Sequence, residues 1–194
     1  MNPVITLPVL FFCLAACVAP GLPTFDSPDD AAFEIVAQID KGQADQAGQI
    51  YASYARTDEA REVIFPILYE TAQARFEAGE TQSSADVLRF VIDQHPDAVS
   101  PRQALIYALF LDRASQPEAD RDLTTEIDQA IKGLRELEAN PVAWLDLVET
   151  QQQIDRGDTL AARKSFAKFL DGWDQEPVEL MLYVEDINRY LSTH

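Results

Sequence analysis

The chain has 194 residues, of which 47% are apolar and 25% charged, a balance typical of a globular protein and not of a disordered one. Its 33 acidic residues against 15 basic ones give a net charge of -18, and all of these charges begin at Asp26. Such an acidic surface repels phosphate backbones and anionic head groups, which excludes nucleic-acid binding and polybasic membrane docking as expected functions.

The amino-terminal segment has the features of a signal peptide. Residues 4–16 form an uncharged apolar run of 13 residues. As a helix this run would span ~20 Å, against the ~30 Å of a bilayer core. Pro20, Gly21 and Pro23 follow and cannot extend a helix. We therefore expect residues 1–16 to be a cleavable signal peptide, although no Lys or Arg precedes the apolar run; an uncleaved anchor or a buried amino-terminal helix is the alternative.

The run ends in Leu14-Ala15-Ala16-Cys17, which resembles the lipobox of bacterial lipoproteins. The resemblance implies cleavage before Cys17 and acylation of its thiol, which would hold the protein at a membrane almost irreversibly. Residues 17–26 would then form a lipidated, Pro-rich tether. Val18, following the cysteine, implies sorting to the outer membrane, facing the periplasm. Since Cys13 would leave with the signal, the mature chain would have no free thiol.

The remainder of the chain, residues 27–194, reads as helices throughout. Ser27 and Pro28 predict a helix start, Phe33, Val36 and Ile39 its apolar face, and Gly42 its end. Further helices are predicted over residues 44–55, 58–78, 82–95, 100 onward, 120–137, 141–156, 159–170 and 177–191, the last as a cap.

Three details refine this prediction. Pro66 lies inside the third helix, where we expect a kink in preference to a split. The apolar run 104–111 is dense enough to predict burial on nearly all sides, at the centre of the core. In the helix over 120–137 the predicted apolar face runs from Leu123 to Leu137. No segment alternates with period two, so the predicted fold class is all-α.

Three glycines reveal an internal repeat. Gly42, Gly79 and Gly157 are separated by 37 and 78 residues, close to one and two periods of about 38. The residue three before each glycine is apolar, the residue five after is small, and the residues nine and twelve after are large and apolar. A unit without a glycine fits near Glu118, followed by Leu123, Ile127 and Ala130. The pattern predicts four antiparallel helix hairpins.

This pattern resembles the tetratricopeptide repeat, best over residues 68–96, where the matching positions are Ala72, Gly79, Ser84, Leu88, Val91 and Pro96. The resemblance implies a solenoid of helix hairpins with a C-terminal capping helix and a role in protein binding. The chain departs from that family in a period longer than 34 residues, and the family's large aromatic residue of the first helix is in register in none of the repeats, with Trp144 slightly off its expected place. A generic helical bundle is the alternative.

Few residues suggest catalysis or a cofactor. His95 and His194 are the only histidines, so a Ser-His-Asp arrangement or a histidine metal site is not expected, and no glycine loop for phosphate is present. His95-Pro96-Asp97 matches the tripeptide of J-domain co-chaperones, but lacks the basic helix before it and is interpreted as a helix stop. We expect no cofactor, no metal and no small-molecule substrate.

Tyr69, Tyr107 and Trp144 are the candidate partner-binding residues. They fall on the first helices of successive predicted pairs, which line the concave groove in the tetratricopeptide family. The alternative is that each packs between neighbouring helices. The sequence thus predicts a membrane-tethered protein-protein interaction scaffold that assists an envelope complex of the pilus, secretin or outer-membrane assembly type. A cell-wall-acting enzyme, or a subunit of one, is the alternative function.

Overall fold

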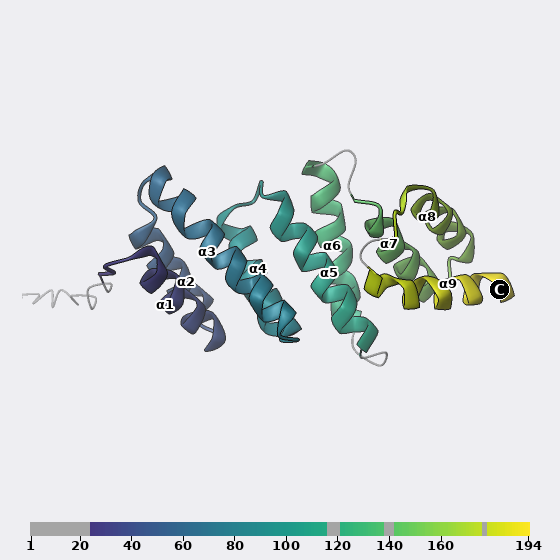
Figure 1. Ribbon diagram of the computed structural model, residues 1–194, viewed down its shortest axis with the longest axis horizontal. Helices are drawn as coiled ribbons and strands as arrows, with labels where there is room; N and C mark the ends of the chain where they lie inside the picture. The colour runs from purple at the N-terminus through teal and green to yellow at the C-terminus, as the bar shows by residue number, and fades with distance from the viewer. Residues whose placement is uncertain (1–23, 116–120, 138–141, 176–177) are drawn as a thin grey trace, which may run out of the picture.

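The computed structural model describes residues 24–115, 121–137, 142–175 and 178–194, and the described chain is helical (Figure 1). The proposed signal peptide, the lipobox and most of the tether lie outside these residues. The elements are α1 (Pro28–Asp40), α2 (Ala44–Tyr54), α3 (Asp58–Glu77), α4 (Thr81–Gln94), α5 (Val99–Ser115), α6 (Arg121–Leu137), α7 (Trp144–Asp155), α8 (Thr159–Gly172), the 3-10 turn η1 (Val178–Leu180) and α9 (Met181–Thr193). The all-α prediction is confirmed.

Local side chains define several helix starts. The Ser27 hydroxyl accepts a hydrogen bond from the backbone N–H of Asp30 at 3.1 Å, and Thr57 and Asp158 cap α3 and α8 in the same way. Helix α3 continues through Pro66 without a break, so the alternative of two separate helices is wrong. The last predicted helix starts with a 3-10 turn, and α9 proper begins at Met181.

The turns at Gly42, Gly79 and Gly157 have the same backbone structure. Each glycine has a φ between 71° and 80°, a left-handed conformation that residues with a side chain adopt at a cost. Each glycine N–H donates to the carbonyl three residues earlier, and the next N–H donates to the carbonyl five residues before itself, at 2.8 to 2.9 Å. This is the Schellman ending of a helix, and it gives the three helix pairs the same reversal of direction.

Successive helices pack against one another along an elongated molecule (Figure 1), with α4 packed on both α3 and α5, and α7 packed on α8. Helix α1 also packs against α3 and α4. The small residue five positions after each turn glycine, Ala47, Ser84 or Ala162, is completely buried where paired helices meet. The Ser84 hydroxyl is satisfied there, because it donates to the carbonyl of Ala72 on α3 at 2.8 Å.

Helix α5 contributes the central part of the core, as predicted. Within the run 104–111, five residues are buried and the other three are half-buried: the buried ones are Leu105, Ile106, Ala108, Leu109 and Phe110. Two predicted core positions are wrong. Phe33 is 76% exposed and Leu137 is 39% exposed. In α1 the buried face runs instead through Ala31, Ala32, Ile35, Val36 and Ile39, because α2, α3 and α4 lie on that side.

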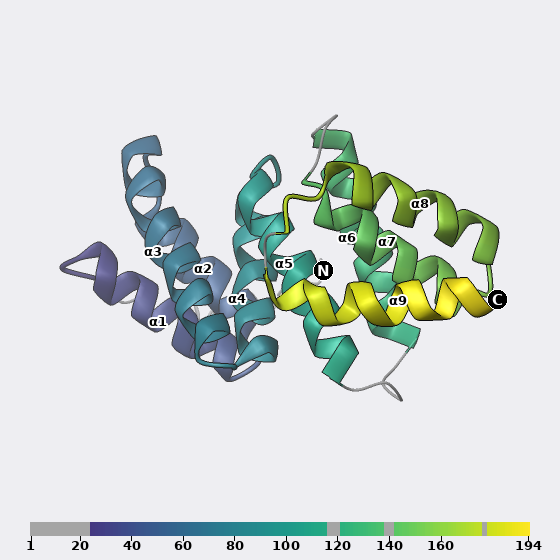
Figure 2. The same cartoon turned by 45° about the vertical axis from the view of Figure 1, so that its right-hand side comes forward.

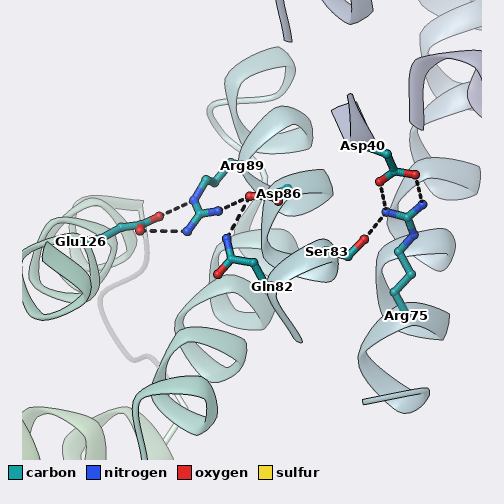
Figure 3. Close-up of polar contacts among 7 residues, drawn as sticks. All are labelled: Asp40, Arg75, Gln82, Ser83, Asp86, Arg89 and Glu126. Atoms are coloured by element: carbon teal, nitrogen blue, oxygen red, sulfur yellow. Dashed lines mark hydrogen bonds and ion pairs between the residues drawn. The ribbon is translucent and has the colours of Figure 1, made fainter. Parts of the chain in front are cut away.

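Arginine side chains connect helices of neighbouring pairs (Figure 3). Arg75 on α3 forms two hydrogen bonds with the carboxylate of Asp40 on α1, at 2.7 and 2.8 Å, and a third with Ser83 on α4. Arg89 on α4 binds both oxygens of Glu126 on α6, at 2.6 and 2.9 Å. Since paired hydrogen bonds fix the guanidinium plane, these contacts set the position of α1 on α3 and of α6 on α4.

Helix α9 runs across the first helices of the C-terminal half (Figures 1 and 2). The ring of Tyr183 lies 5.2 Å from that of Phe110 on α5, centroid to centroid. Near the other end of α9, the Arg163 guanidinium on α8 donates to the carbonyl of Leu191 at 2.9 Å. Helix α9 therefore extends from α5 past α7 to α8, and it buries Ile187 and Leu191.

Candidate docking site

A groove between α1 and α3 lies in the N-terminal half of the described chain. We call it the α1/α3 groove, and its volume is about 440 Å³. It is lined by Asp29, Ala32, Phe33, Val36, Ala37, Asp40, Ile67, Thr71 and Arg75. The Phe33 ring stands beside the groove with 76% of its surface in solvent. The ring adjoins the apolar residues of the groove and enlarges the apolar surface exposed there, and such contiguous apolar surface is typical of a contact site.

Two acidic side chains, Asp29 and Asp40, and one basic side chain, Arg75, line the α1/α3 groove. Residues 24–77 contain eleven acidic and four basic side chains. Arg75, the only basic residue lining the groove, is neutralised by Asp40, and its hydrogen bond holds the pKa of Asp40 below its ordinary value. The groove therefore presents an apolar floor in a negative electrostatic field, which favours a basic partner.

The predicted binding aromatics lie in two places. Tyr107 on α5 contacts Trp144 at the start of α7, with ring centroids 5.4 Å apart, and Phe76 on α3, at 5.7 Å. Tyr69 lies apart from them and stacks on Phe65 of its own helix, at 6.3 Å. The three residues Tyr69, Tyr107 and Trp144 lie on α3, on α5 and at the start of α7, respectively. All three are half-buried and pack against the core.

Burial determines the ionisation state of Tyr107 and Tyr69. It raises the pKa of Tyr107 to about 12, with a smaller contribution from Glu179 and Tyr183, and it also raises the pKa of Tyr69. Both phenols are neutral at physiological pH. The packing of Tyr107 between Phe76 and Trp144 is the arrangement expected of side chains that hold α3, α5 and α7 together, which was the alternative interpretation of these residues.

A second pocket, of about 710 Å³, lies at the turns that join α2 to α3 and α4 to α5. There the Tyr51 hydroxyl lies 2.6 Å from Nε2 of His95, and the Phe65 ring lies 4.6 Å from the imidazole. Burial, followed by the positive charge of Arg61, lowers the pKa of His95. Helix α4 does end at Gln94, so the helix-stop interpretation of His95 is confirmed. Sequence analysis missed its partner Tyr51, which is 44 residues away.

Among the described residues, no group of three or more His, Cys, Asp and Glu side chains is placed to hold a metal ion. Likewise, no helix in the described ranges is long and apolar enough to cross a bilayer. Comparisons with protein-family models, with curated proteins and with solved structures found no match to this chain.

Proposed function

We propose that this protein is a membrane-tethered scaffold that binds another envelope protein through the α1/α3 groove. The observation that carries the proposal is Phe33, a large ring at 76% exposure beside an apolar groove. Buried aromatic anchors dominate binding energies at protein interfaces, so an exposed one on a rigid helix is well placed to become such an anchor. The surrounding acidic charge restricts the partner to a segment with basic residues beside its apolar contact.

The proposed architecture is a tetratricopeptide-like solenoid of four hairpins. Its support is the common Schellman turn at Gly42, Gly79 and Gly157 and the buried small residue that follows each of them. In this arrangement the first helices α1, α3, α5 and α7 form one continuous face, and the α1/α3 groove belongs to it.

The tether is a separate part of the proposal. The lipobox Leu14-Ala15-Ala16-Cys17 supports acylation of Cys17, with residues 18–26 as the spacer to the first helix and the outer membrane as its location. Replacing Cys17 by serine should release the protein from the membrane fraction and remove the mass of the lipid. An unchanged mass and an unchanged distribution between fractions would contradict the anchor.

Docking is tested by cross-linking the tethered full chain in its native membrane and capturing it. Phe33→Ala should reduce recovery of the partner by about tenfold, the effect of removing one interface anchor. The matched control is Leu182→Ala on α9, which removes a side chain with a similar exposure of 73%. Partner recovery that is equal in the two variants would show that the α1/α3 groove is not the docking surface.

A further inference from the structure

Helix α9 shows how a helix can lie on the first-helix face of this protein. Its side chains Tyr183, Ile187 and Tyr190 line a space of about 370 Å³ between α9 and the helices α5 and α7. The positions 183, 187 and 190 are one and two turns apart, so they form one stripe of an amphipathic helix. Large side chains of this stripe, and not close backbone contact, connect α9 to α5 and α7.

The α1 wall of the α1/α3 groove and the α7 wall of the space under α9 share two positions, although the opposite wall follows α1 in the chain (α3) and precedes α7 (α5). Val36 on α1 lies six residues before Gly42 and lines the α1/α3 groove. Gln151 on α7 lies six residues before Gly157 and lines the space under α9. Two residues before the same glycines, Asp40 lines the α1/α3 groove and Asp155 lines the space under α9. Each aspartate forms an ion pair with an arginine of a neighbouring first helix, Arg75 on α3 or Arg113 on α5.

The two faces differ in what lies over them. Helix α9 crosses the face of α5 and α7, whereas no described segment of the chain covers the α1/α3 groove, where Phe33 remains 76% exposed. On the premise that this groove is the docking surface, we propose that its occupant is an amphipathic helix of a basic partner protein, which crosses α1 and α3 as α9 crosses α5 and α7.

Charge identifies the partner as a basic protein and not a second copy of this chain. The N-terminal segment 24–77 has eleven acidic side chains against four basic ones. Helix α9 of another copy would bring Glu185 and Asp186 with a single basic residue, Arg189, into this field. A second copy also has a net charge of -18, so its approach is repelled. A helix with the α9 stripe and basic flanks has the complementary charge.

A synthetic peptide of residues 178–194 with Glu185→Lys and Asp186→Lys is the direct probe. The peptide keeps the α9 stripe of Tyr183, Ile187 and Tyr190, and it replaces the two acidic residues beside that stripe by lysine. Fluorescence anisotropy of the labelled peptide with the full chain should give saturable binding, at least about tenfold tighter than that of the unmodified sequence. The affinity should decrease as the salt concentration rises. The same peptide with Ile187→Pro, which cannot form the helix, should bind at least about tenfold more weakly.

The position of the peptide is tested with two variants of the full chain. Phe33→Ala should weaken binding by about tenfold, and Leu182→Ala should leave it unchanged. If the peptide binds the Phe33→Ala chain as tightly as the wild type, it binds elsewhere, for example on α5 and α7 where α9 lies, and the proposal is overturned. Equal binding of the proline peptide or of the acidic peptide would overturn its helical or its basic character.

The two proposals fail in different ways. If an envelope partner is captured in a Phe33-dependent manner while the lysine peptide does not bind, the helical occupant is wrong and the docking function stands. If the peptide binds beside Phe33 while no captured protein depends on that residue, the groove accepts a helix and the scaffold function is wrong.

Discussion

The α1/α3 and α5/α7 faces of this molecule each carry an aspartate paired with an arginine across two helices, and they differ in their covering. On the C-terminal face, α9 buries its own Ile187 to 3% exposure, whereas beside the N-terminal groove Phe33 is 76% exposed. An apolar side chain that is buried between helices lowers the free energy of the folded state. An exposed apolar side chain gives this gain only when a partner covers it. Ile187 therefore stabilises the fold, whereas Phe33 is available for a partner.

The largest expected difference is between Ile187 and Phe33. Ile187→Ala should lower the free energy of unfolding by about 2–5 kcal/mol, because it leaves a cavity beneath α9. Phe33→Ala should change it by less than about 0.5 kcal/mol, because the ring has little contact to lose. Urea unfolding of the two variants measures both values. If Ile187→Ala and Phe33→Ala lower the free energy of unfolding by similar amounts, the two faces do not differ in how their apolar residues contribute to folding.

The ion pairs provide a second test of the comparison. The arginines of the two pairs, Arg113 and Arg75, are both 18% exposed, whereas Asp155 under α9 is 25% exposed and Asp40 in the open groove is 46% exposed. Asp155→Asn should destabilise the protein by about 1–3 kcal/mol, because it weakens the less solvated of the two pairs and leaves the partly buried Arg113 charge unneutralised. Asp40→Asn should cost less than about 1 kcal/mol in urea unfolding. The reverse order would contradict the assignment of the covered face.

The pH dependence of the Asp40 pair has a definite sign. The hydrogen bond from Arg75 lowers the pKa of Asp40 from 3.8, so the unfolded chain binds more protons at this site than the folded one. The pair therefore stabilises the fold above that ordinary value, and the stabilisation disappears as the pH falls through the lowered pKa. The stability difference between the wild type and Asp40→Asn should shrink accordingly in acid.

The turn glycines should behave alike in both halves. A Cβ at Gly42 or Gly157 would have no atom within 4 Å, so alanine meets no steric clash and is opposed only by the left-handed backbone. Each Gly→Ala change should therefore lower stability by about 1 kcal/mol. Thermal unfolding of the two single variants tests this equivalence. A much larger effect at one of them would show that the two turns do not share a role.

His95, which lies in the same N-terminal half as the α1/α3 groove, should give the smallest change in stability. Burial lowers its pKa from 6.5, so the folded chain binds fewer protons than the unfolded chain. The neutral imidazole stabilises the fold above this value, and the stabilisation decreases as the pH falls below it. Comparing urea midpoints at about pH 7.5 and about pH 5.5 should show a smaller decrease for His95→Gln than for the wild type. His194→Gln controls for the loss of a histidine as such.

Most helix boundaries were predictable because their causes are local. Ser27 caps α1 by bonding to a backbone N–H three residues away, and Gly42 ends it through bonds that reach back only a few residues. Phe33 was assigned to the core because helical periodicity places it near Val36 and Ile39, although α3 and α4 select an adjacent stripe. The pairing of Tyr51 with His95 had no local signal, since 44 residues separate them.

The helical class, the turn glycines and the order of the helices follow from local sequence, because hydrogen bonds within a few residues and a period of 3.6 produce these features. The lipobox ending at Cys17 stays a prediction. The position of α9 over α5 and α7, with the groove beside Phe33 left open, follows from long-range packing. This position depends on contacts between residues far apart in the chain, such as Phe110 and Tyr183, whose meeting no local pattern encodes.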